Sequence, residues 1–149
     1  MNSDELWMEE ALRCAQRALQ SGEVPVGAVV VCKQEIVGRG WNLSISNHDP
    51  TAHAEMVALR RAGETLGNYR LEGCELFATI EPCAMRAGAL VHARIARLIY
   101  GADDAKAGAV HSVMQLLESP QLNHRISVHG GILAGRSAEL LQTFFQNRR

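Results

Sequence analysis

The order of strand and helix patterns along the chain restricts the fold more than any other feature. Two β-branched runs, VGAVVVC (Val26 to Cys32) and IVGRGW (Ile36 to Trp41), are separated by three polar residues, which predicts a β-hairpin. After it, strand patterns at 75–80 and 97–102 alternate with helical patterns. Right-handed crossovers between such strands place helices on both faces of the sheet. We expect an α/β fold: a three-layer α/β/α sandwich with a mixed five-stranded sheet.

The helices are predicted from apolar spacing and from capping residues. Apolar residues between Met8 and Leu19 recur with the helical period, and Ser21-Gly22 supplies a stop. A second helix is expected to begin at Asp49 to Thr51 and to end at Gly63, because Asp and Thr cap helices and Pro fits an opening turn. The remaining expected elements are a helix from Pro82 to Ala93, a short helix at 112–117, a short strand at 125–130 and a final helix through Leu140 and Phe145.

Length and composition predict one ordinary domain. The chain has 149 residues, of which 47% are hydrophobic and 21% charged, so we expect a single domain over residues 1–149. No segment reaches the roughly 20 apolar residues of a membrane span, and the acidic start does not resemble a secretory signal. A cytoplasmic protein with no membrane partner is expected. Its net charge of -1 disfavours a non-specific nucleic-acid coat, and no DNA partner is expected.

Two predicted helix starts carry residues that suit a metal. His53 offers an imidazole nitrogen, and Cys83 offers a sulfur whose pKa falls at the positive end of a helix. Catalytic zinc usually takes three protein ligands and leaves its fourth position to water. Glu55 is two residues from His53, a spacing that does not place both on one helical face, so its expected role is proton transfer. Cys14, Cys32 and Cys74 are instead read as core residues.

Arg86 stands where a second sulfur would complete the metal site. Residues three apart share a helical face, so position 86 is the natural partner of Cys83. A guanidinium stays protonated and has no lone pair to give a metal. It also repels one, because two like unit charges 4 Å apart repel by about 4 kcal/mol at an effective dielectric of 20, and a divalent ion doubles this. Zinc affinity is expected to fall by several orders of magnitude.

The chain resembles the cytidine deaminase-like superfamily, whose pattern is H-A-E followed by P-C-x-x-C, and within it the bacterial tRNA-specific adenosine deaminases. The resemblance covers nearly the whole length. Its matching pieces are EVPVGAVVV, GWN, HDPTAHAEMVALR, NYRL, TIEPCAM, AGALVHARI, YGADDAKAGA, LNHR and FFQNRR. It implies the cytidine deaminase-like fold, a homodimer, one zinc per chain, and hydrolytic deamination of adenosine to inosine at the wobble position of a tRNA anticodon stem-loop.

The resemblance also implies roles for individual residues. By position, His53 and Cys83 match metal ligands and Glu55 matches the proton shuttle, whereas Arg86 occupies the third ligand position. The residues that match positions near the nucleotides are Asn42, Asp104, Lys106, Phe145, Arg148 and Arg149.

Arg86 leaves three hypotheses open. It is a substitution in an ordinary enzyme; or the chain is a relative that keeps the RNA surface with little or no activity, as a binding module or partner subunit; or the pocket is metal-free and Arg86 pairs with Glu55. His111, in a position where relatives commonly carry Gly, is a weaker candidate to replace the missing ligand. A deaminase of free nucleosides or guanine is the remaining alternative, and DDAKAGA and FFQNRR disfavour it.

Overall fold

The computed structural model describes residues 2–147 and contains one mixed sheet of five strands. Its strand order is β2-β1-β3-β4-β5, in which β1 is antiparallel to β2 and β3, and β3, β4 and β5 are parallel. The elements in chain order are α1 (Ser3–Gln20), β1 (Gly27–Cys32), β2 (Glu35–Trp41), α2 (Ala54–Leu66), β3 (Glu75–Ile80), α3 (Ala84–Ala93), β4 (Arg97–Ala102), the 3₁₀ helix η1 (Leu116–Glu118), β5 (Ser127–His129) and α4 (Ala134–Asn147). The predicted α/β fold with a mixed five-stranded sheet is confirmed.

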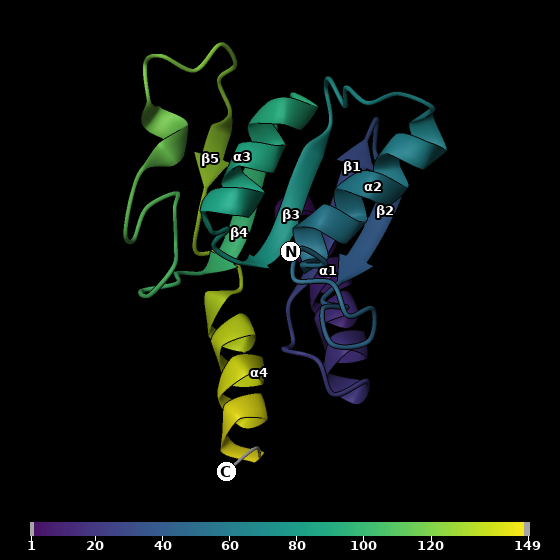
Figure 1. The fold of residues 1–149 in the computed structure, drawn as a ribbon, viewed down its shortest axis with the longest axis vertical. Coiled ribbons are helices and arrows are strands. Elements are labelled where there is room, and N and C mark those ends of the chain that lie inside the picture. Colours follow the sequence, from purple (N-terminus) through teal and green to yellow (C-terminus); the bar gives the residue numbers. More distant parts are fainter. Residues whose placement is uncertain (1, 148–149) are drawn as a thin grey trace.

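The helices lie on both faces of this sheet, so the predicted three layers are present (Figure 1). Helices α2 and α3 cover one face, where buried side chains from both helices pack on the alternate residues of β1, β3 and β4. Helix α1 covers the other face, and its residues Met8 and Leu12 pack against Val29, Phe77 and Ile99. Helix α4 adds Leu140 to this second cluster. Alternation along each strand thus divides the core into two apolar layers.

Glycines on β2 bring helix α2 close to the sheet. A Cβ atom on Gly38 would lie 2.4 Å from the carbonyl oxygen of Ala58, and one on Gly40 would lie 2.2 Å from that of Ala54. Only a residue without a side chain permits this approach. The small residues of α2 that face these glycines are themselves buried. This packing fixes the height of the first turn of α2 above the sheet, and with it the position of Glu55.

The bounds predicted for α2 were wrong at both ends. The segment before it forms a turn in which the Asp49 carboxylate accepts hydrogen bonds from the backbone and the hydroxyl of Thr51, both at 2.8 Å, so the helix starts only at Ala54. It continues past Gly63 to Leu66, and the left-handed backbone of Gly67 (φ 66°) ends it. The predicted helix at 112–117 is only the short η1, and α3 begins at Ala84 rather than Pro82.

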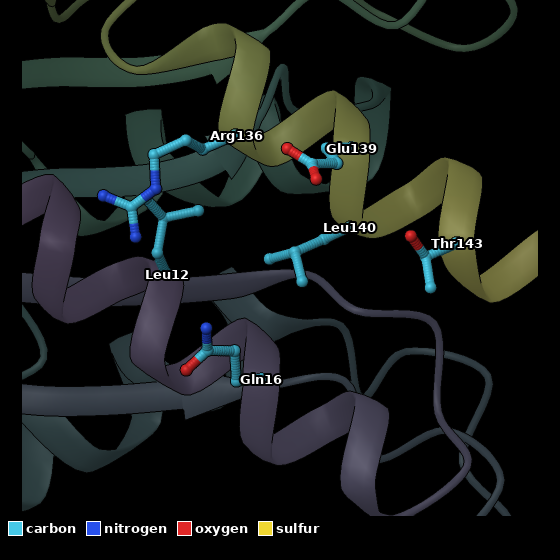
Figure 2. Close-up of a pocket in the computed structure, with 6 residues that line it drawn as sticks. All are labelled: Leu12, Gln16, Arg136, Glu139, Leu140 and Thr143. Carbon is cyan, nitrogen blue, oxygen red and sulfur yellow. The ribbon is translucent and has the colours of Figure 1, made fainter.

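A small hollow lies between α1 and α4, on the face of the sheet that α1 covers. Figure 2 shows Leu12 and Gln16 of α1 facing Leu140 and Thr143 of α4 across it. Its volume is about 200 Å³. Among the described residues, no helix is long and apolar enough to cross a membrane.

Candidate functional site

The candidate site lies where the first turns of α2 and α3 meet at the carboxyl end of β3. His53 and Cys83 are the N-cap residues of these helices, and both have extended backbone conformations. Glu55 follows in the first turn of α2 and is fully buried. The structure therefore brings together the two predicted metal ligands and the predicted proton-transfer residue. Carboxyl ends of strands in open α/β sheets are common positions for binding sites.

Arg86 points into this site and pairs with Glu55. Its Nη1 donates to both carboxylate oxygens of Glu55, at 3.0 and 3.2 Å. The side chain of Arg86 is 7% exposed and that of Glu55 0%, so the ion pair is shielded from water. Burial alone would lower the pKa of Arg86, but the charge of Glu55 and the contact with Cys83 outweigh it and raise this pKa. Arg86 therefore stays charged, and the contact between Arg86 and Glu55 that the third of the three hypotheses requires is present.

Cys83 is the second partner of the guanidinium. Nε of Arg86 donates to the Cys83 sulfur at 3.2 Å. Burial alone would raise the pKa of Cys83, but hydrogen bonds with His53 and with Arg86 outweigh it and lower this pKa to about 6. The sulfur at the start of α3 is thus a thiolate at neutral pH that faces one imidazole and one guanidinium.

These residues do not fit a catalytic zinc ion. Such an ion needs three protein ligands, which in zinc deaminases are one His and two Cys, and only His53 and Cys83 are present. The remaining position is filled by a cation that has no lone pair. Within residues 2–147 no group of three His, Cys, Asp or Glu side chains is placed to hold a metal. His111 does not replace the missing ligand, since its ring is exposed on the loop after β4.

An open hollow of about 590 Å³ leads from the surface to this site. Its lining includes His53 and Arg86 of the site. It also includes four of the residues predicted to lie near nucleotides, namely Asn42, Asp104, Lys106 and Phe145. A volume of this order suits a small ligand or one nucleoside. Phe145 of α4 is 56% exposed, which leaves an aromatic face at the rim. Arg148 and Arg149, also predicted near the nucleotides, lie outside the described residues.

Asn42 shapes the hollow by capping α2. Its side-chain oxygen accepts a hydrogen bond from the backbone N–H of Ala54 at 2.9 Å, which satisfies one of the donors at the helix start. The amide NH₂ group of Asn42 is left to donate to a nucleotide. Cap and lining roles are combined in one side chain.

Glu81 holds the loop that carries Asp104 and Lys106. It is fully buried, and its carboxylate accepts hydrogen bonds from the backbone N–H groups of Asp104 at 3.0 Å, Val110 at 3.1 Å, His111 at 2.7 Å and Ser112 at 2.9 Å. Burial alone would raise the pKa of Glu81, but hydrogen bonds led by those of Ser112 lower it to about 2. This carboxylate fixes one wall of the hollow.

Glu23 holds the loop after β2 through backbone hydrogen bonds of the same kind. Its buried carboxylate accepts from the backbone N–H of Ile45 at 3.1 Å and of Ser46 at 2.7 Å. Both glutamates were missed in the sequence. The signal for Glu81 was its place between a buried strand and Pro82, since a charge in such a position needs a buried partner.

The segment that carries this site matches a known family model. The cytidine and deoxycytidylate deaminase zinc-binding region matches residues 1–102 of the chain. This range contains β1 to β4 and the whole His53, Glu55, Cys83 and Arg86 cluster.

Relatives similar over the whole chain are tRNA-specific adenosine deaminases. That of Haemophilus influenzae is 48% identical over 147 residues, covering 98% of this chain and 85% of the relative. That of Bacillus subtilis is 42% identical over 149 residues, covering 100% and 92%.

Solved structures agree in fold. A structure from work on A-to-I editing by tRNA:A34 deaminases superposes with a TM-score of 0.88 at 43% identity, covering 91% of this chain and 99% of that chain. A guanine deaminase from Bacillus subtilis superposes with a TM-score of 0.67 at 31% identity, covering 99% and 94%.

Proposed function

Since this chain belongs to the zinc-binding cytidine and deoxycytidylate deaminase family, with tRNA-specific adenosine deaminases as its full-length relatives, we propose that its hollow receives the wobble adenosine of a tRNA anticodon stem-loop. The reaction of that group is hydrolytic deamination of adenosine to inosine, which consumes water and releases ammonia. Zinc is the cofactor of the family. The single observation that carries the proposal is the set of residues that line the hollow beside the buried Glu55.

The lining suits a nucleotide of a single-stranded loop. Phe145 offers an aromatic face for base stacking, Asn42 an amide for hydrogen bonds to a base, and Lys106 a charge for a phosphate. Lys106 and Asp104 lie on the loop that Glu81 fixes, so the backbone that carries these side chains is positioned before RNA arrives. A guanine deaminase is the weaker alternative, because the guanine deaminase named above is less identical to this chain than the tRNA deaminases.

A second candidate function follows from the pair of Arg86 and Glu55. Because the carboxylate is held by a guanidinium, and one metal ligand is missing, the chain fits a tRNA-binding module or partner subunit without turnover. The two candidates share the RNA site and differ only in chemistry. Only the first assigns Glu55 proton transfer at the base, whereas in the second Glu55 stays paired with Arg86.

The experiment measures binding and turnover separately. A fluorescent anticodon stem-loop with a wobble adenosine is titrated with the purified protein, and inosine in full-length tRNA is measured by mass spectrometry after digestion. Lys106→Ala is expected to weaken binding and to reduce the salt dependence by about one phosphate contact. The matched control is Lys33→Ala, the other lysine, which is exposed in the β1–β2 turn at the opposite end of the sheet.

Each result bears on one candidate. Inosine formation by the unaltered protein supports the deaminase, and binding without inosine supports the module. Equal affinities for the Lys106→Ala and Lys33→Ala variants, or no affinity of the unaltered protein for the stem-loop, would contradict the proposed site.

The proposal extends to domain organisation, assembly and location. We propose one domain over residues 1–149 that forms a homodimer in the cytoplasm and has no DNA partner. Exposed apolar side chains near the site, Met85 at the start of α3 and Val113 and Met114 between β4 and η1, support a contact with a second copy. Light scattering coupled to size exclusion, on the unaltered protein and a Met114→Glu variant, tests the dimer.

A further inference from the structure

We propose that the guanidinium of Arg86 takes the place of the metal ion in this chain, so that the site is stable and binds RNA without zinc. The inference rests on the proposed function only for the choice of RNA. Its basis is the disagreement between the donor set of the site and the needs of a catalytic zinc ion.

The guanidinium of Arg86 lies between the sulfur of Cys83, a metal ligand in the family, and the carboxylate of Glu55. Arg86 lies one helical turn after Cys83 on α3, and its Nε reaches the Cys83 sulfur at 3.2 Å. Its Nη1 continues to the Glu55 carboxylate on the neighbouring helix. One side chain thus joins the first turns of α2 and α3. A metal bound to Cys83 would have to displace the donor that now contacts that sulfur.

The charges make this arrangement self-sufficient. Glu55 is fully buried, and a buried carboxylate needs a compensating charge. Arg86 supplies it through two hydrogen bonds to the carboxylate, and a third bond goes to the sulfur of Cys83. A divalent cation that entered the site would meet a fixed positive charge and would find one ligand too few. Both effects act against metal binding in the same direction.

The same contacts change the role of Glu55. Both of its oxygens accept hydrogen bonds from Nη1, so the carboxylate is engaged by protein instead of by a ligand in the hollow. In this chain Glu55 therefore stabilises the fold as half of a buried ion pair. Removal of either half leaves a buried charge without a partner, which is costly.

The test compares zinc content in three proteins that are purified in parallel: the unaltered chain, Arg86→Cys and Arg86→Ala. Zinc is measured by inductively coupled plasma mass spectrometry and by release to a chromogenic chelator. We expect about one zinc per chain in Arg86→Cys, because it restores the His and two Cys ligands. The unaltered chain and Arg86→Ala are expected to hold none. The alanine variant shows whether loss of the charge alone is enough.

The ion pair is tested by a double-mutant cycle on thermal stability, which does not depend on turnover. Glu55→Gln and Arg86→Met are each expected to lower the melting temperature, and the double variant is expected to lose less than the sum of both. In the Arg86→Cys background, Glu55→Gln is expected to leave the zinc content unchanged. Additive losses in the cycle would overturn the structural role of the pair.

Two further outcomes would overturn the inference. One is a full equivalent of zinc in the unaltered protein that is lost in a Cys83→Ala variant. The other is a folded Arg86→Cys protein without zinc, since Arg86 would then not be what excludes the metal. If Arg86→Cys does not fold, added zinc is tested on the unaltered protein, and a rise in its melting temperature would contradict the inference. Stem-loop binding is measured alongside, so that failure of the RNA site is seen separately.

Discussion

Replacement of Glu81 by Gln is expected to destabilise the protein strongly and in a pH-dependent way. The variant keeps the size of the side chain and removes the negative charge. In the folded protein the pKa of Glu81 is lowered from 4.5 to about 2, because the carboxylate accepts hydrogen bonds from Ser112 and three other backbone N–H groups. A difference of this size corresponds to roughly 3 kcal/mol of stability at neutral pH.

The sign of the pH dependence follows from the lowered pKa. Because the folded state holds the proton less tightly than the unfolded state, the contribution of Glu81 is complete above about pH 5 and is lost as the pH falls toward 2. The free energy of unfolding of the variant is therefore expected to lie about 3 kcal/mol below that of the unaltered protein at pH 7, and only about 1 kcal/mol below it at pH 3.

The assay is urea unfolding at both pH values, monitored by tryptophan fluorescence. Glu72→Gln is the control, because Glu72 is exposed and its ion pair with Arg70 is long, at 3.9 Å, so a change below about 0.5 kcal/mol is expected. A difference for Glu81→Gln that is below about 1 kcal/mol at pH 7, or that is equal at pH 7 and pH 3, would refute the reasoning.

Two other predictions concern the same loop and the N-terminal helix. Gly108→Ala is expected to cost about 1–3 kcal/mol in urea unfolding, because its Cβ would lie 2.3 Å from the Glu81 carboxyl carbon, whereas Gly135→Ala, with no atom within 4 Å, is expected to be neutral or slightly stabilising. Equal effects would contradict the proposed tight contact. Arg97→Met removes hydrogen bonds to Asp4 of α1 and Glu75 of β3 and is expected to cost about 1 kcal/mol. This loss should shrink in 1 M salt, and a salt-independent loss would argue against an electrostatic cause.

The strands could be predicted closely because their signals are local. The third and fourth strands were placed at 75–80 and 97–102, as observed, since β-branched and apolar runs between turn residues mark buried strands. The start of α2 could not be placed in this way. Asp49 is a good capping residue by type, but its carboxylate closes a turn with Thr51. His53 instead occupies the N-cap position, and the side chain of Asn42 accepts the hydrogen bond from the backbone N–H of Ala54.

The site was predictable in its residues and less so in its contacts. His53, Glu55, Cys83 and Arg86 were identified from motif spacing, but the spacing alone left three hypotheses for Arg86. The direction of a long side chain depends on which groups the neighbouring helix presents, and this is decided by tertiary packing. Glu81 was missed for the same reason, since its partners come from a loop more than 20 residues later.

The hollow of this chain is held together by contacts that do not involve a metal. Glu81 fixes the loop that forms one wall, Asn42 fixes the start of α2, and the pair of Arg86 and Glu55 joins α2 to α3. The buried ion pair of Arg86 and Glu55 lies where the family's catalytic zinc ligands lie, and removal of either partner would leave a buried charge unpaired. The shape that would receive RNA is therefore separable from the chemistry that would modify it. A chain built in this way can lose a metal ligand without loss of its fold.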